Sequence, residues 1–182
     1  MQRQKHIHYR HTAKLTTLLA LAAVALSQSA WSAPPIEVRF AMSFVGNAAH
    51  GELIRQGRYE QAARLLGDTA EESIAVKINL CVARVMGGQH FRARLDCHRA
   101  VKMAEAEALA ATEGERDAQN RNWATALSNR GVRRALRRQY GAEQDFQQAL
   151  ELDADSSVAV RNLAQLNGAD DDYSLAVAAS GE

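Results

Sequence analysis

The sequence contains little proline, few aromatic residues and only two cysteines, and these shortages narrow the choice of fold. Its two prolines are adjacent, at Pro34 and Pro35, and aromatic residues make up 5% of the chain. A long proline-free run rich in Ala, Leu, Gln, Glu and Arg is typical of stacked helices and argues against an all-β domain. With 182 residues, we expect one soluble all-α domain or a short row of repeats with appendages.

Neither sign of charge dominates, with 22 basic and 21 acidic residues. Four of the basic residues and none of the acidic ones lie in residues 1–32, so the remaining 18 basic and 21 acidic residues give a mild net charge of −3. This balance does not favour a nucleic-acid partner, and we expect none.

Residues 1–32 have the pattern of a secretory signal peptide. Basic residues precede an apolar run at residues 15–26, and small residues follow it, including Ala30 and Ser32. We expect cleavage before Ala33, a periplasmic or secreted location, and no membrane span afterwards. An uncleaved anchor is the alternative, although the apolar run is shorter than the roughly 20 residues that a spanning helix needs.

Residues 33–42 are predicted to form an extended lead-in. Pro34 and Pro35 favour extended backbone, and Ile36, Val38 and Phe40 alternate with charged residues as in a strand. Helical periodicity is expected from about Met42. The lead-in either packs against the first helical hairpin or has no partner and stays mobile.

The stretch at residues 129–153 predicts two short helices joined by a turn near residues 139–141. Its second helix carries an apolar stripe at i, i+4, i+7 and i+8, formed by Ala142, Phe146, Ala149 and Leu150. Two such helices cannot bury their stripes alone, so the hairpin needs neighbours of the same kind.

Ala142 and Phe146 match the A-x3-F spacing of the tetratricopeptide (TPR) repeat, which this stretch resembles. The resemblance implies an all-α, right-handed solenoid of about three helical hairpins plus a C-terminal capping helix, spanning residues 43–166. Its parts would be repeats at 43–73, 74–107 and 124–156, a capping helix at 157–166 and an acidic, flexible tail at 167–182. The Ala- and Glu-rich stretch at residues 102–121 is expected to lengthen the two helices beside it, whose tips would meet near Thr112–Gly114. The spacing from Gly131 to Ala142 is one residue shorter than in the family, which predicts a tighter turn.

The resemblance also implies a function in protein–protein interaction. In TPR proteins that bind peptides, the register of Asn79, Asn129 and Asn162 faces a concave surface and can hold a ligand backbone. Other residues expected there are Val82, Val132, Arg161 and Gln165. The partner would be a protein or peptide of the cell envelope. The alternative is that asparagine is simply common at this position in repeats without a ligand.

Cys81 and Cys97 occupy positions that face each other across the repeat hairpin, so the resemblance favours a disulfide between them. A disulfide is compatible with an exported protein, and the alternative is two small buried thiols that fill core positions. No metal site is expected from the neighbouring histidines, and no C-x-x-C redox motif is present.

Five arginines share one broad face of the predicted helix before Ala142: Arg130, Arg133, Arg134, Arg137 and Arg138. Nearby acids, among them Glu143 and Asp145, could neutralise them in an ordinary salt-bridged surface. The alternative is an accessory module that binds an anionic envelope ligand through this face. No catalytic or cofactor motif is recognisable, so we expect a non-enzymatic scaffold without cofactors, and only a substrate screen would reveal a hydrolase.

Overall fold

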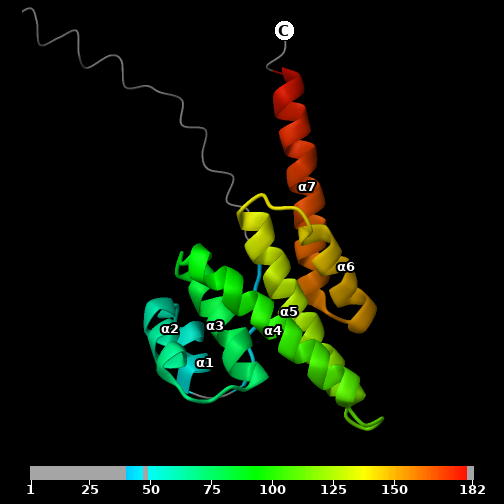
Figure 1. Cartoon of the computed structure of the whole chain (residues 1–182). Coiled ribbons are helices and arrows are strands. Elements are labelled where there is room, and N and C mark those ends of the chain that lie inside the picture. The colour runs from blue at the N-terminus through cyan, green and yellow to red at the C-terminus, as the bar shows by residue number, and fades with distance from the viewer. Residues whose placement is uncertain (1–39, 47–48, 180–182) are drawn as a thin grey trace, which may run out of the picture. The chain divides into compact units, whose positions relative to one another are not determined.

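The computed structural model describes residues 40–46 and 49–179, and side chains within this part up to residue 168, except that of Ala49. All of these residues belong to one unit, Val38–Glu182. The expected signal peptide and residues 33–39 of the lead-in lie outside the described residues. The described part is all-helical and contains no strand (Figure 1); its helices are α1 (Ala49–Arg55), α2 (Tyr59–Asp68), α3 (Ile74–Met86), α4 (His90–Ala110), α5 (Arg116–Leu136), α6 (Ala142–Leu152) and α7 (Ser157–Ala179).

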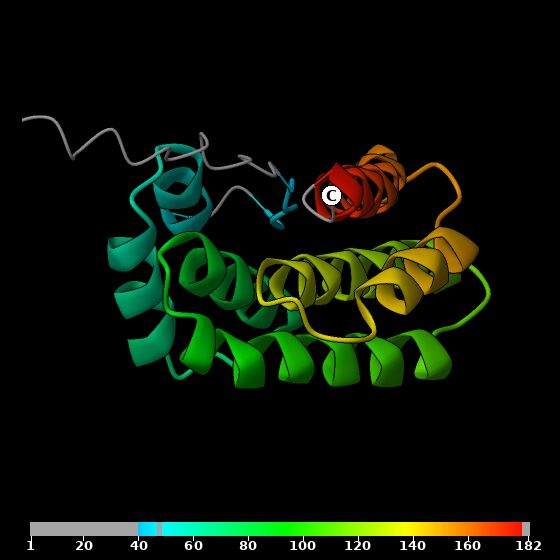
Figure 2. The ribbon, with the colours of Figure 1, turned by 90° about the horizontal axis from the view of Figure 1, so that it is seen from above.

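Consecutive helices pack against each other throughout the described chain. In addition, α1 contacts α3, α3 contacts α5, and α5 contacts α7, so these four helices form a continuous row. No comparable contacts join α2, α4 and α6 to one another in the described part. The view from above shows α1 and α2 at one end of this arrangement and α6 at the other (Figure 2).

The turns within the three hairpins depend on residues in the left-handed backbone region. Gly57 (φ 72°) and Gly88 (φ 73°) follow α1 and α3, where glycine adopts this conformation without steric cost. After α5 the same place is taken by Arg138 (φ 49°), and Gly141 (φ 88°) adds a second left-handed residue directly before α6. The turn between α5 and α6 comprises residues 137–141 and is longer than residues 87–89 between α3 and α4, so the predicted tighter turn is wrong. Although the spacing from Gly131 to Ala142 is one residue shorter, α6 begins later in its repeat, only at Ala142.

Helices α4 and α5 are both long, with 21 residues each. They are connected by residues 111–115, where the N–H and hydroxyl of Thr112 both donate to the carboxylate of Glu115. The predicted lengthening of both helices and the meeting of their tips near Thr112–Gly114 are therefore confirmed. Alanine and glutamate keep the stretch helical on either side of this turn.

Two predicted boundaries are wrong, one at each end of the helical region. The first repeat was expected to start at residue 43, but residues 40–46 contain no helix and α1 begins only at Ala49. The apolar alternation of the lead-in continues through Phe40, Met42 and Phe44, so the extended stretch outlasts the predicted boundary at residue 42.

The capping helix was expected to end at residue 166, before a flexible tail. Instead α7 continues through Gly168 to Ala179. A single glycine inside a helix costs only about 1 kcal/mol relative to alanine. The alanines and leucine after Gly168 have high helix propensity, which favours continuation.

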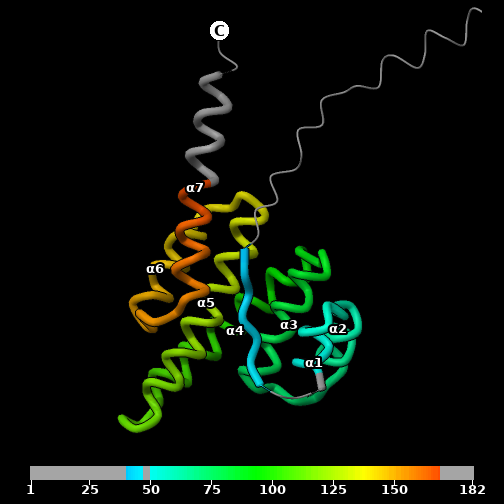
Figure 3. Tube along the Cα trace, turned by 180° about the vertical axis from the view of Figure 1, so that it is seen from behind, coloured from blue at the N-terminus to red at the C-terminus, as the bar shows by residue number. Residues whose placement is uncertain are grey.

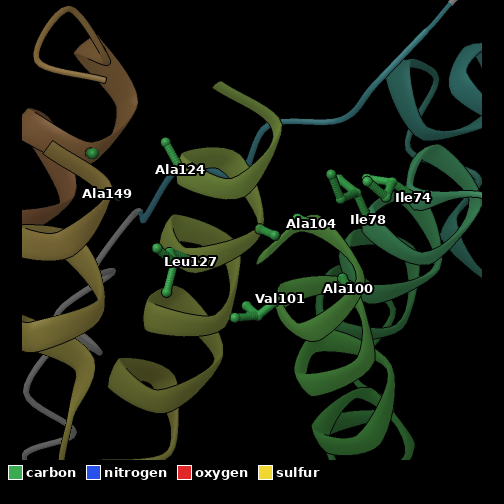
Figure 4. Packing of buried hydrophobic residues seen from close by; sticks show 10 residues of the cluster. Ile74, Ile78, Ala100, Val101, Ala104, Ala124, Leu127 and Ala149 are labelled. Carbon is green, nitrogen blue, oxygen red and sulfur yellow. The ribbon is translucent and has the colours of Figure 1, made fainter. Parts of the chain in front are cut away.

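The helices are held together by three clusters of buried apolar residues. One cluster joins helices from α3 to α7 (Figure 4), and six of its ten buried members are alanine: Ala100, Ala104, Ala124, Ala126, Ala149 and Ala159. Because alanine side chains are small, the helix backbones can approach each other closely in this cluster. Helix α3 lies centrally and buries ten of its 13 residues, as expected of a helix that is apolar nearly all round.

Candidate functional site

Three buried asparagines mark the same position on three helices of the row. Asn79 lies on α3, Asn129 on α5 and Asn162 on α7, and each is 0% exposed. A buried amide without hydrogen-bond partners would be costly. Each of these three side-chain amides therefore needs hydrogen-bond partners inside the protein.

Each asparagine binds both backbone polar groups of one residue in the N-terminal segment (residues 40–46). The N–H of Val45 donates to Oδ1 of Asn79 (2.8 Å), and Nδ2 of Asn79 donates to the carbonyl oxygen of Val45 (2.7 Å). Asn129 makes the same pair of bonds to Ser43, at 3.0 and 2.7 Å. Asn162 makes them to Ala41, at 2.9 and 2.8 Å.

The segment therefore crosses the row in the direction opposite to the helix order, from α7 past α5 and α3 (Figure 3). The bonded residues are two apart, which is an advance of about 6.6 Å along an extended chain. Neighbouring packed helices are about 8–10 Å apart. The asparagine side chains can bridge this difference, so every second residue of the segment meets one helix of the row. We call the residues of α3, α5 and α7 that contact the segment the segment-binding face.

Three large side chains of the segment pack into the apolar clusters beside this face. The Phe40 ring lies 6.2 Å from that of Phe146 on α6, with an angle of 24° between the planes. Met42 packs against two of the clusters. Phe44 packs near α1, where the guanidinium carbon of Arg55 lies 5.5 Å from its ring centroid.

Of the other residues expected at the site, two line it and two do not. Val82 and Val132 are buried in the clusters that receive Met42. Arg161 is exposed and Gln165 is half-buried, and neither makes a hydrogen bond to the segment within the described chain. Phe40, Met42 and Phe44 belong to the site but are not among the residues predicted for it, although the alternation of apolar residues from Ile36 onwards was the available signal.

The predicted arginine face is not a continuous solvent-facing surface, because part of it turns towards α6. Arg130 makes a two-pronged contact to the carboxylate of Asp145, with Nη2 to Oδ1 at 2.6 Å and Nε to Oδ2 at 3.0 Å. Arg134 also pairs with Asp145 (Nη1 to Oδ1, 2.8 Å) and donates to the carbonyl of Gly141. Asp145 itself is 2% exposed, so the pairing is well shielded from water.

Arg133 is also withdrawn from solvent and is 6% exposed. Its Nη2 donates to Oε1 of Gln139 at 2.7 Å. Burial lowers the pKa of Arg133 from its usual value, and the neighbouring charges of Arg134 and Arg94 lower it further. Arg137 and Arg138 are exposed, so they are the members of the predicted face that remain open to solvent.

Cys81 on α3 and Cys97 on α4 are joined by a disulfide, with their Cα atoms 4.7 Å apart. Both residues are buried, at 1% and 0% exposure. The bond ties together the hairpin that carries Asn79, two residues before Cys81.

No protein-family model matches the chain, and no curated protein or solved structure matches it at a significant level. Among the described residues, none of the helices combines the length and the apolar character required to cross a membrane.

Proposed function

We propose that the chain is a non-enzymatic protein-interaction module whose segment-binding face holds an extended polypeptide. In this proposal the helices form a short TPR-like solenoid of about three hairpins, closed by α7. The observation that carries it is the set of six hydrogen bonds from Asn79, Asn129 and Asn162 to backbone N–H and C=O groups. In a solenoid each repeat stacks on its neighbours, so equivalent positions of successive repeats line one extended surface.

The chemistry of asparagine explains why this face suits an extended chain. The amide offers one acceptor and one donor side by side, matching the N–H and C=O of a single residue in an extended strand. The asparagines contact only backbone atoms of the bound chain. These hydrogen bonds therefore add affinity but do not select for particular side chains. Selectivity would come from the positions that receive alternate side chains, as in other modes of strand recognition.

We further propose that the protein is exported and acts in the periplasm or outside the cell. The signal-like pattern of residues 1–32 supports this proposal, although it lies outside the described residues. The disulfide between Cys81 and Cys97 adds support, because such bonds persist in oxidising compartments. The partner would then be a protein or peptide of the cell envelope.

The alternative, an anionic ligand on the arginine face, has less support. Arg130 and Arg134 already share the buried carboxylate of Asp145, and Arg133 is bonded to Gln139. An anion would have to compete with Asp145 for these groups.

A peptide-display selection against the full chain tests the proposed function. Peptides that bind the segment-binding face should lose at least about tenfold in affinity when Asn129→Ala and Asn162→Ala are introduced, since four backbone contacts disappear. The matched control is Asn122→Ala, because Asn122 lies on the same helix as Asn129 but, within the described residues, its side chain bonds to Gln119 and not to the segment. Circular dichroism should show that all variants keep their helices. Selected peptides that bind the asparagine variants and the control equally well would refute the proposal.

A further inference from the structure

The polypeptide that occupies the segment-binding face belongs to the chain itself, although it is remote in sequence from the helices that hold it. Ala41 and its partner Asn162 are 121 residues apart, and Ser43 and Asn129 are 86 apart. All hydrogen bonds described for residues 40–46 involve the three asparagines. The segment thus resembles a bound peptide more than a helix-forming part of the domain.

Building on the proposed function, we propose that residues 40–46 are a tethered ligand occupying the site of a partner's segment. The partner presents an extended strand with three large apolar side chains at alternating positions. These side chains take the places of Phe40, Met42 and Phe44, and the partner's backbone takes over the bonds to the asparagines.

The side chains of the segment define what the partner must offer. Phe40 stacks on Phe146, Met42 packs between two clusters, and Phe44 lies under Arg55. The bonded residues between them are small or medium in size: Ala41, Ser43 and Val45. A matching partner therefore requires large apolar residues at every second position, and a free N–H at each of the residues between.

The segment can leave without dismantling the helices. Residues 40–45 are all half-buried and Gly46 is exposed, so no part of the segment lies fully inside the protein. The fully buried members of the three clusters come from the helices alone. Once uncovered, the asparagine amides would be reachable by water, which can satisfy their hydrogen bonds until a partner binds.

Tethering makes the segment a strong competitor. A ligand joined to its site by a short linker acts at an effective concentration of about millimolar. A partner in trans must overcome this occupancy, so its apparent affinity is reduced by the fraction of molecules in which the face is open. Weakening the chain's own segment should therefore strengthen binding of a free peptide.

The test uses a labelled peptide with the sequence of residues 38–46, VRFAMSFVG. It is titrated against the full chain and against a triple variant with Phe40→Ser, Met42→Ser and Phe44→Ser. We expect the triple variant to bind the peptide at least tenfold more tightly than the unchanged chain. Adding Asn129→Ala to the triple variant should abolish this gain, and adding Asn122→Ala should preserve it.

Two modified peptides provide a matched control for the backbone contacts. N-methylation at the residue corresponding to Ser43 removes the N–H that binds Asn129 and should abolish binding. N-methylation at the residue corresponding to Phe44 removes an N–H that has no described partner, and this peptide should still bind. Equal effects of both modifications would overturn the proposed register.

Other outcomes are equally decisive. If the triple variant loses its helical signal and the peptide does not restore it, the segment is an integral part of the core and the proposal is wrong. If the helical signal is restored by the peptide, the segment acts in trans and the proposal stands. A concentration-dependent dimer of the unchanged chain that disappears in the triple variant would assign the face to a second copy and overturn the proposal.

This experiment can fail separately from the proposed function. Display selection repeated on the triple variant could yield peptides that depend on the asparagines but lack alternating apolar residues. That result would keep the peptide-binding function and eliminate the tethered-ligand proposal. If no selected peptide depends on the asparagines, the function itself fails.

Discussion

The hairpins α3–α4 and α5–α6 place corresponding residues at the same points but join their helices by different chemistry. Asparagine, arginine and aspartate recur in both, as Asn79 and Asn129, Arg84 and Arg134, and Asp96 and Asp145. Each arginine forms an ion pair with the aspartate of its own hairpin. The difference lies at one contact between the two helices, because Cys81 and Cys97 in one hairpin correspond to Gly131 and Phe146 in the other.

At that contact α3–α4 has the disulfide bond, whereas α5–α6 has the Phe146 ring packed against the backbone at Gly131. A Cβ built on Gly131 would lie only 2.6 Å from Cε1 of Phe146, so glycine is required for the ring to fit. Two helices of a hairpin can thus be joined at the same point either by a disulfide or by close packing of a ring. The two solutions should respond very differently to mutation and to reduction.

The largest effect is expected from Phe146→Ala, which removes the ring from the hairpin α5–α6. Phe146 is 0% exposed, and deletion of a buried phenylalanine side chain typically costs about 3–5 kcal/mol. Urea denaturation measures the loss, and hydrogen exchange should show α5 and α6 losing protection before α3 and α4. The control is Phe91→Ala, where the ring is 90% exposed and the change should stay within about 0.5 kcal/mol. Similar losses for the two variants would contradict the role assigned to Phe146.

Reduction of the disulfide between Cys81 and Cys97 should lower the stability of the hairpin α3–α4. The bond spans 16 residues, and closing a loop of this size contributes about 3 kcal/mol on a chain-entropy argument. Denaturation with and without a reductant measures the loss, and α3–α4 should then exchange at least as fast as α5–α6. The variant with Cys81→Ala and Cys97→Ala should be insensitive to reductant. An unchanged stability of the original chain after verified reduction would show that packing alone holds α3–α4.

Gly131→Ala tests the close approach of the ring directly. The added methyl group collides with Phe146, and overpacking of this kind typically costs about 1–3 kcal/mol. Combining it with Phe146→Leu should recover part of the loss, because the smaller side chain leaves room for the methyl group. Gly114→Ala is the control, since no atom lies within 4 Å of the added Cβ. Strictly additive losses in the double variant would mean that the two positions do not interact.

The parts of the fold that local sequence controls were the predictable ones. Alanine- and glutamate-rich composition was sufficient to predict the long α4 and α5 and the turn near Gly114. The helix end predicted at Gly168 is wrong, because one unfavourable residue does not end a helix when the residues after it favour one. Propensity is a sum over a window, and a single glycine rarely outweighs its neighbours.

The content of the site could be only partly predicted. The register of Asn79, Asn129 and Asn162 is visible as a spacing, which led to the hypothesis of a ligand backbone. Nothing local indicates that residues 41–45 would supply that backbone, because these contacts join positions up to 121 residues apart. The apolar alternation from Ile36 to Phe44 was visible, but it specifies an extended chain without specifying the surface that it covers.

The smallest expected effect concerns the turns, where residues 87–89 join α3 to α4 and residues 137–141 join α5 to α6. Gly141→Ala forces alanine into a left-handed conformation (φ 88°) and brings its Cβ to 2.9 Å from Nη1 of Arg134. Gly88→Ala imposes a similar conformation (φ 73°) with no atom within 4 Å, so it isolates the backbone cost of about 1 kcal/mol. Because the end of an arginine side chain can move aside, Gly141→Ala should cost only slightly more than Gly88→Ala in urea denaturation. A much larger loss at Gly141 would mean that Arg134 cannot leave Asp145, and that the ion pair is a fixed part of the turn between α5 and α6.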